Sequence, residues 1–136
     1  MSLRQKAEAD RLGAEVVRFA RSMVGLSMSP TGLVVLCFAE LGVSLADDLL
    51  ALHRAGDQIL GSDLLPADLI FRTGPHDVFH PGERRYGIGH VGIYTGDKTV
   101  IHASFWSGRV DETDIDEFFD AAYGHFRGTR RIIART

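Results

Sequence analysis

The sequence lacks the features that mark several large classes of protein. It has one cysteine in 136 residues, so an internal disulfide is excluded. Its formal net charge is −3, with acidic and basic residues interspersed, whereas nucleic-acid-binding domains usually have a basic face. No apolar run approaches the roughly 20 residues of a membrane span. We therefore expect neither a nucleic-acid partner nor a membrane span.

Linkers, repeats and low-complexity tracts are also missing. The chain has four prolines, and no Pro/Ser-rich stretch divides it. With 45% hydrophobic and 24% charged residues, its composition is that of a globular protein. The charged start "MSLRQKAEADRLG" has no apolar h-region, so no signal peptide is predicted in this chain. We expect residues 1–136 to form a single domain.

Helical periodicity dominates the first part of the chain. Residues 4–24 show an amphipathic pattern that predicts a helix. Residues 30–41 are apolar almost all round, which predicts a buried helix with Ser29 as its cap and Pro30 at its first position. The segment "LADDLLALHRAG" predicts a third, shorter helix that closes at Gly56.

The second part of the chain changes to strand patterns. Residues 69–72 predict a strand, and the polar residues 73–87 predict a long loop. Further strands are predicted at residues 109–111 and in "TRRIIA", and Thr113 and Asp116 between them resemble a capping pair. The capped helix would contain Ile115, Phe118, Phe119 and Ala122. Helices followed by strands predict an α+β fold.

Two histidines are predicted to face each other in a hairpin. The segment "GHVGIYTGDKTVIHAS" is typical of two strands joined by a turn at "GD". If Tyr94 pairs with Lys98 around a three-residue loop, His90 lies opposite His102. Their Cβ atoms would then be roughly 4.5–5.5 Å apart on one face. Gly92 lies on the same face and leaves room for a neighbour.

Such a pair suits proton transfer. One imidazole takes up or delivers a proton near neutral pH, while the other fixes its tautomer and orientation. This is the base and orienting part of a nucleophile–base–orienter triad. Two half-buried structural histidines would show the same spacing, so both interpretations stay open at this point.

Four motifs, in this order, resemble those of the NlpC/P60 family of cell-wall cysteine peptidases. The family's D-C-S-G-L-V, L-x-P-G-D-L, H-V-G-I-Y and I-H-A segments have counterparts in "SPTGLV" (29–34), "LLPADL" (64–69), "HVGIY" (90–94) and "IHAS" (101–104). The resemblance covers nearly the whole chain. It implies a papain-like α+β fold, with N-terminal helices packed on an antiparallel sheet, and cleavage of peptide bonds in peptidoglycan stems as the family's activity.

The resemblance also assigns roles to residues. His90 matches the general base and His102 the orienting residue. Pro30 matches the nucleophilic cysteine, and Ser29 and Thr31 match the flanking Asp and Ser that help to hold the substrate's amino end. A cysteine at a helix N-terminus gains from the dipole and a nearby imidazole, which stabilise its thiolate. Pro30 keeps the helix start but removes the sulfur, and "GLSMS" is too short for the family's upstream Tyr and "WGG" segment.

Other side chains are candidates for the missing nucleophile. Cys37 follows Pro30 by about two helical turns in an apolar helix, where a cysteine is usually an inert core residue. Ser29 and Thr31 have hydroxyl groups near the required place. Helix capping and solvation are the ordinary explanation for both hydroxyls.

A zinc site is an alternative use of the histidines. His76 and His80 are spaced i, i+4, and together with His90 and His102 they offer four imidazoles. The neighbouring Pro81 and "GP" indicate a loop, which removes the helical reason for this spacing. We therefore predict no metal and no cofactor.

Two classes of function compete. The first is a catalytically impaired domain that binds a peptide, a peptidoglycan fragment or a protein partner in the cleft of the fold. Its predicted binding residues are Ser29, Thr31, Tyr94 and Trp106. The second is an active amide or ester hydrolase with an unconventional nucleophile. The resemblance implies the cell envelope or secretion, and the sequence is also compatible with the cytoplasm.

Overall fold

The protein combines helices with one antiparallel sheet. Over residues 2–119 and 124–134, which the computed structural model describes, the helices are α1 (Leu3–Ser22), α2 (Pro30–Ala39), α3 (Leu49–Leu52) and α4 (Ile115–Phe119), with a 3₁₀ turn at Gly61–Asp63. The strands are β1 (Asp57–Ile59), β2 (Leu69–Arg72), β3 (His90–Tyr94), β4 (Thr99–Ala103), β5 (Val110–Asp114) and β6 (Phe126–Arg131).

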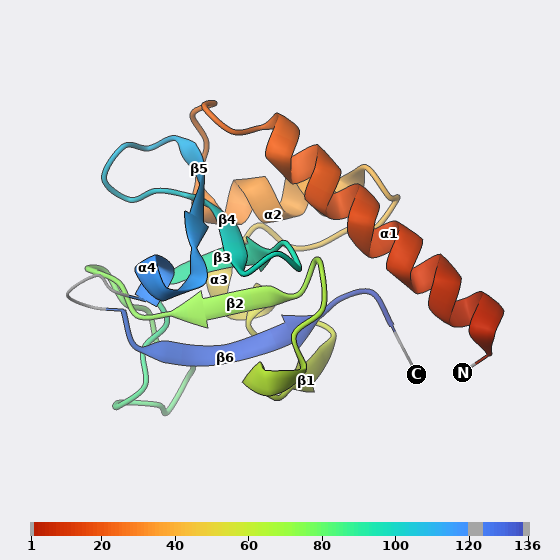
Figure 1. Cartoon of the computed structure of the whole chain (residues 1–136). Helices are drawn as coiled ribbons and strands as arrows, with labels where there is room; N and C mark the ends of the chain where they lie inside the picture. The colour runs from red at the N-terminus through yellow and green to blue at the C-terminus, as the bar shows by residue number, and fades with distance from the viewer. Residues whose placement is uncertain (1, 120–123, 135–136) are drawn as a thin grey trace.

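The sheet separates two layers of apolar side chains. Its strand order is β1-β6-β2-β3-β4-β5, and every neighbouring pair is antiparallel. Helices α1 and α2 pack on one face, and α4 lies on the other (Figure 1). Val91 and Ile93 of β3 belong to the core under α2, whereas Ile70, Val100 and Phe118 form a smaller cluster on the α4 side. The predicted α+β fold, with helices packed on an antiparallel sheet, is confirmed.

Helix α2 forms as its sequence predicts. The Ser29 hydroxyl accepts a hydrogen bond from the Gly32 N–H at 3.0 Å, and Pro30 occupies the first turn, where its missing N–H is not needed. The helix lies in the centre of the core because it is apolar on nearly all sides. Its fully buried residues are Leu33, Val34, Cys37 and Phe38.

Some predicted local elements are wrong in detail. The third helix is one turn, Leu49–Leu52, and it begins only where the Asp48 carboxylate accepts the Ala51 N–H. Thr113 does not cap α4, because pairing with β4 extends β5 as far as Asp114. The Asp114 carboxylate instead accepts the Asp116 N–H at 2.8 Å. The remaining predicted helix residue, Ala122, lies outside the described residues.

The β3–β4 hairpin has a different register from the predicted one. Tyr94 pairs with Val100 rather than with Lys98. The three-residue loop therefore begins one residue later than predicted. Gly96 and Lys98 both have positive φ, at 92° and 63°. A lysine seldom adopts this left-handed conformation, so the sequence pattern gave no sign of it.

The corrected register changes how the two histidines meet. It shifts the pairing by two residues, and an even shift leaves each side chain on its face of the sheet. His90 and His102 are therefore diagonal neighbours on one face rather than directly opposite. Gly92 provides the predicted space, since a Cβ there would lie 3.3 Å from the His102 Cβ and 3.2 Å from the Phe118 ring.

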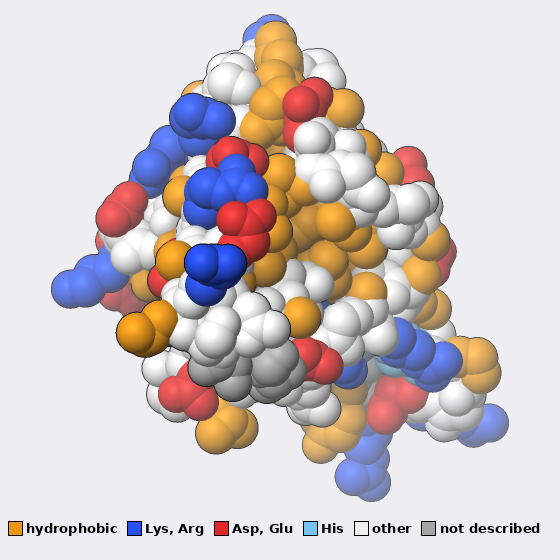
Figure 2. All heavy atoms as spheres, turned by 90° about the vertical axis from the view of Figure 1, so that its right-hand side faces the viewer, with side chains coloured by type: hydrophobic (Ala, Val, Ile, Leu, Met, Phe, Trp, Pro, Cys, Tyr) orange, Lys and Arg blue, Asp and Glu red, His pale blue; other side chains and the backbone are white. Residues whose placement is uncertain are grey.

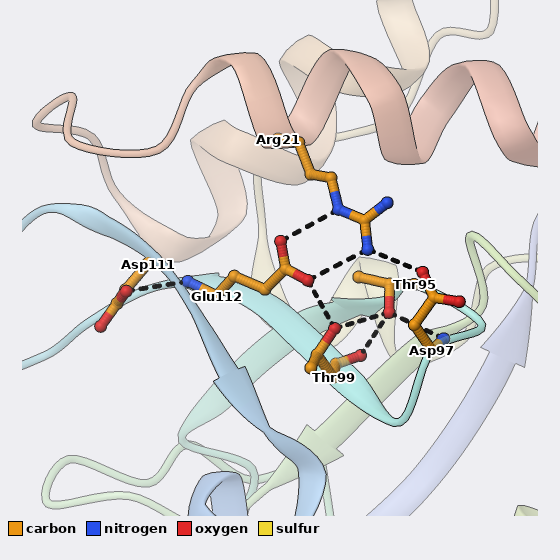
Figure 3. Close-up of polar contacts among 6 residues, drawn as sticks. All are labelled: Arg21, Thr95, Asp97, Thr99, Asp111 and Glu112. Carbon is orange, nitrogen blue, oxygen red and sulfur yellow. Dashed lines mark hydrogen bonds and ion pairs between the residues drawn. The ribbon is translucent and has the colours of Figure 1, made fainter.

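A polar network fastens the end of α1 to the sheet (Figure 3). The Arg21 guanidinium contacts Glu112 of β5 at 3.0 Å and Asp97 of the β3–β4 turn at 2.8 Å. The Thr99 hydroxyl donates a hydrogen bond to the Glu112 carboxylate at 2.6 Å, and the Oγ1 atoms of Thr99 and Thr95 lie 2.7 Å apart. These carboxylates raise the pKa of Arg21. Because the groups are largely exposed, we expect the network to orient α1 more than it stabilises the fold.

A buried ion pair holds the turn before β2. The Asp68 side chain is 2% exposed, and it accepts hydrogen bonds from the Leu65 N–H at 2.7 Å and from Arg131 at 2.8 and 3.0 Å. The preceding residue, Ala67, has a φ of 77°, where the resembled motif has glycine. The ion pair thus ties a strained turn to β6.

An apolar hollow lies between α1 and the C-terminal segment. Figure 2 shows hydrophobic side chains gathered on this face. The hollow has a volume of about 620 Å³, and its apolar lining includes Ala9, Leu12, Leu41, Val43, Ile132 and Ile133.

No helix among the described residues is long and apolar enough to cross a membrane.

Candidate functional site

The structure brings His90 and His102 into direct contact. His90 Nε2 lies 2.9 Å from His102 Nδ1, and the two rings are nearly perpendicular, with centroids 5.1 Å apart. The other nitrogen of His102, Nε2, lies 3.1 Å from the Thr113 hydroxyl. The result is a hydrogen-bonded chain across three strands, from β3 through β4 to β5.

The α4 side of the sheet encloses this pair. Phe118 of α4 stacks on His90 with ring centroids 5.7 Å apart and meets His102 edge to face at 5.1 Å. His90 is 3% exposed and His102 is 6% exposed. The hairpin pattern predicts that the two histidines are adjacent, but only the structure shows that Phe118 covers them.

Burial and a nearby cation keep both imidazoles neutral. Burial, with smaller effects of the positive charge of Arg72 and of the His102 ring, lowers the pKa of His90 to about 3. For His102, burial is again the main cause and Arg72 the second, and they lower its pKa to about 4 against an opposing effect of Asp111. Both rings are therefore uncharged at pH 7 and weak proton acceptors.

Neutral rings allow two tautomer arrangements along the chain. If His90 Nε2 donates to His102 Nδ1, then His102 donates to the Thr113 oxygen and His90 Nδ1 carries a lone pair. The opposite direction makes Thr113 the donor and leaves a proton on His90 Nδ1. Among the described residues His90 Nδ1 has no hydrogen-bond partner, so it is the nitrogen that remains for a ligand.

A cavity of about 320 Å³ opens beside the pair. Strands β4 and β5, helix α4, the end of β2 and the β4–β5 loop form its walls. Its lining residues are Arg72, His102, Ser104, Phe105, Trp106, Thr113, Glu117 and Phe118. Trp106 is 83% exposed and belongs to this lining, and its role in binding a ligand stays a prediction.

The start of α2 does not line this cavity. The N–H of Met28, just before the helix, donates to Gly108 O at 3.3 Å, which places the helix start against the β4–β5 loop. Neither Ser29 nor Thr31 is hydrogen-bonded to His90 in the part of the chain that the structure describes. The expectation that His90 points at Pro30 therefore stays a prediction.

Cys37 lies on the other side of the sheet from the histidine pair, and its thiol is unreactive. It is fully buried in the core under the opposite face of the sheet. Burial, with a smaller effect of Glu40, raises the pKa of its thiol to about 12. A thiol with such a pKa is not ionised at neutral pH and is a poor nucleophile.

The remaining predicted residues lie in several places. Tyr94 is half-buried on the α4 side of the sheet, beside Ile70 and Val100 rather than in the cavity. The ring centroids of His76 and Phe105 lie 5.6 Å apart. His80 lies away from the cavity, and its Nε2 is hydrogen-bonded to His53 Nδ1 at 2.8 Å. Across residues 2–119 and 124–134, no group of three or more His, Cys, Asp or Glu side chains is placed to hold a metal ion.

Sequence reasoning missed three residues of the site. Arg72 ends the otherwise apolar strand "LIFR", and this isolated charge in a buried strand was the available signal. The sequence pattern predicts Thr113 as a helix cap and Phe118 as a residue of the capped helix. Their contacts with the histidines depend on how β5 and α4 pack, which no local pattern encodes.

Comparisons with known proteins agree with the fold described above. The model of the NlpC/P60 family matches residues 24–127. An NlpC/P60 family protein from Bacillus cereus superposes with a TM-score of 0.75 at 17% identity, over 90% of this chain and 40% of its own. The P60 domain of an antigen from M. avium subspecies paratuberculosis has a TM-score of 0.73 at 20% identity, over 94% of this chain and 99% of its own.

A third solved structure is named for its activity. The peptidoglycan hydrolase RipB from Mycobacterium tuberculosis has a TM-score of 0.71 at 23% identity, over 96% of this chain and 69% of its own. The chain spans less than half the length of the B. cereus protein and of NlpC2 and NlpC1 from Trichomonas vaginalis. No curated protein matches it in sequence. At these identities the structural likeness concerns the fold.

Proposed function

Because the chain belongs to the NlpC/P60 family, we propose that it is a catalytically impaired member that binds a peptide, a cell-wall fragment or a protein partner. The binding site is the cleft beside His90 and His102. In this proposal residues 1–136 act as one domain, and Pro30 occupies the place of the nucleophilic cysteine.

The observation that carries this proposal is a histidine pair without a usable thiol. His90 and His102 are hydrogen-bonded at 2.9 Å, as a base and its orienting residue would be. The chain's single cysteine, Cys37, is buried in the core with a pKa of about 12. Under this proposal the cleft lacks the thiol that attacks the substrate in a cysteine peptidase.

The hydroxyl groups at the start of α2 make no hydrogen bond to His90 among the described residues, which supports the proposal. The Ser29 hydroxyl accepts the Gly32 N–H and so serves as the helix cap. An attacking hydroxyl needs a hydrogen bond to its base, and among the described residues neither Ser29 nor Thr31 makes one to His90. The lowered pKa of His90 further weakens it as a base at neutral pH.

The names of related structures support the ligand class. RipB from M. tuberculosis and SagA are peptidoglycan hydrolases. A domain of the same fold with an impaired site is suited to hold a related peptide without cleaving it. The exposed Trp106 at the cavity rim offers a flat apolar surface for such a ligand.

The second candidate is an active amide or ester hydrolase with an unconventional nucleophile. It is favoured by one observation, the intact hydrogen bond between His90 and His102, which a pure binding domain does not require. Activity that survives Cys37→Ala and disappears in His90→Ala would identify this second function.

The Pro30→Cys variant tests the assignment of the nucleophile position. Made in a Cys37→Ala background, it places one thiol at the start of α2. We expect this thiol to react with iodoacetamide with an apparent pKa below the roughly 8.5 of a free cysteine, because the helix dipole and a hydrogen bond donated by Nδ1 of the neutral His90 ring stabilise the thiolate. Loss of Pro at this position is expected to cost about 1 kcal/mol or less.

A second variant separates the two causes. The helix dipole persists in Pro30→Cys combined with His90→Ala, so only the contribution of the imidazole is removed. We expect the pH profile of alkylation to move towards that of a free cysteine. A thiol whose profile ignores the loss of His90 would show that Pro30 does not occupy the nucleophile position.

A further inference from the structure

Arg72 is a buried cation that forms no ion pair with any of the described residues. It is the last residue of β2 and is 7% exposed. Its Nη1 donates to Thr73 O at 2.8 Å, whereas its buried Nε has no hydrogen-bond partner. Over residues 2–119 and 124–134, no carboxylate forms an ion pair with it. Buried charges are normally paired, so an unpaired one indicates a missing partner.

The charges around Arg72 do not neutralise it. Asp77 acts on it electrostatically, but the Asp77 carboxylate accepts the Gly74 N–H at 2.7 Å. Glu117 lines the same cavity without reaching ion-pair distance. The nearest aromatic contact is Phe118, whose ring centroid lies 4.9 Å from the Arg72 Cζ. Burial outweighs Asp77 and lowers the pKa of Arg72.

The cavity beside Arg72 has both a polar floor and an apolar rim. Arg72 and the Thr113 hydroxyl offer hydrogen-bond donors to a group that enters it. Phe105 and Trp106 stand at the rim with their rings in edge-to-face contact at 5.6 Å, and they are 48% and 83% exposed. Among the charged residues of the lining, Arg72 carries the positive charge and Glu117 the negative one.

We propose that this cavity binds an oxyanion, a carboxylate or a phosphate, of a ligand whose flat or apolar part packs on Phe105 and Trp106. Arg72 selects the anion, because a guanidinium presents a planar fork of donors that matches such groups. The inference deepens the proposed function, on which it rests, by naming the chemical group that the cleft recognises.

Three small probes test this inference on the wild-type chain. N-acetylphenylalanine carries a carboxylate, N-acetylphenylalaninamide is its neutral counterpart, and phenyl phosphate carries a phosphate. Fluorescence of Trp106, the single tryptophan of the chain, reports binding. We expect the acid or the phosphate to bind about tenfold more tightly than the amide, since charged hydrogen bonds contribute that much. The tighter of the two identifies the anion, and equal affinity of all three overturns the proposal.

Arg72→Met shows whether this side chain is responsible. It keeps the length of the apolar stem, and we expect the preference for the anion over the amide to fall below about twofold. Arg127→Met is the matched control, because Arg127 lies over Tyr86 at a different cavity. A preference that persists in Arg72→Met overturns the proposal. If that variant does not fold, the wild-type comparison of the three probes decides alone.

The two proposals fail separately. The alkylation profile of Pro30→Cys does not involve an anion, and the probe titration does not involve residue 30. If the Pro30→Cys thiol has the expected lowered pKa and depends on His90, but the probes show no preference for an anion, then only the role of Arg72 is rejected.

Discussion

The free energy of unfolding is expected to fall by about 5 kcal/mol as the pH decreases from 6.5 to 4, through the His90–His102 pair alone. In the unfolded chain both histidines take up protons near pH 6.5. In the folded protein their pKa values are about 3 and 4, so the unfolded state binds more protons between pH 6.5 and 4. Stability from this source is complete above pH 6.5 and is lost as the pH falls.

Chemical denaturation at several pH values measures this effect. Carboxylates with lowered pKa, such as Glu112, and the histidines His53 and His80 contribute with the same sign, so the total slope alone is not diagnostic. The double variant His90→Gln, His102→Gln removes the pair, and we expect a shallower dependence on pH. His76→Gln, an exposed histidine, is the control. An unchanged slope in the double variant would contradict the burial of the pair.

Asp68→Asn is expected to lower the free energy of unfolding by about 3–5 kcal/mol. The substitution leaves Arg131, whose side chain is 12% exposed, without its charged partner. It also weakens the acceptor for the Leu65 N–H in the turn before β2. Removal of one partner of a buried pair costs more than the pair itself contributes, because the other charge stays buried. Urea denaturation at pH 7 measures the loss.

The exposed network of Arg21 supplies the comparison. Asp97→Asn breaks an ion pair whose side chains are 41% and 68% exposed, and we expect it to cost less than about 1 kcal/mol. If Asp68→Asn is as mild as Asp97→Asn, then the turn before β2 does not depend on its ion pair.

The elements that formed as predicted are those with a complete local signal. Helix α2 has a cap, a proline in its first turn and an apolar surface, and strand β2 has an apolar run. The strand β1, Asp57–Ile59, was missed because three mostly exposed residues carry no strand pattern. It exists only by pairing with β6, which lies far away in the sequence.

The two central histidines of the candidate site were predictable from the sequence, whereas Arg72, Thr113 and Phe118 were not. The adjacency of His90 and His102 survived a wrong hairpin register, because an even shift preserves the face. The positive φ of Lys98, which sets that register, depends on the folded loop rather than on residue type. Arg72 joins the site through its pairing with His90 across β2 and β3, a contact that no segment encodes by itself.

The most direct test of a catalytically impaired binding domain is to incubate the wild-type chain with purified peptidoglycan stem peptides. NMR spectra report binding, and mass spectrometry of the same samples reports cleavage. A family member with peptidoglycan hydrolase activity, run in parallel, shows that the peptides are cleavable. We predict shifted resonances for residues around the cavity and intact peptide. Cleavage by the wild-type chain that disappears in His90→Ala would contradict the account and establish an active hydrolase instead.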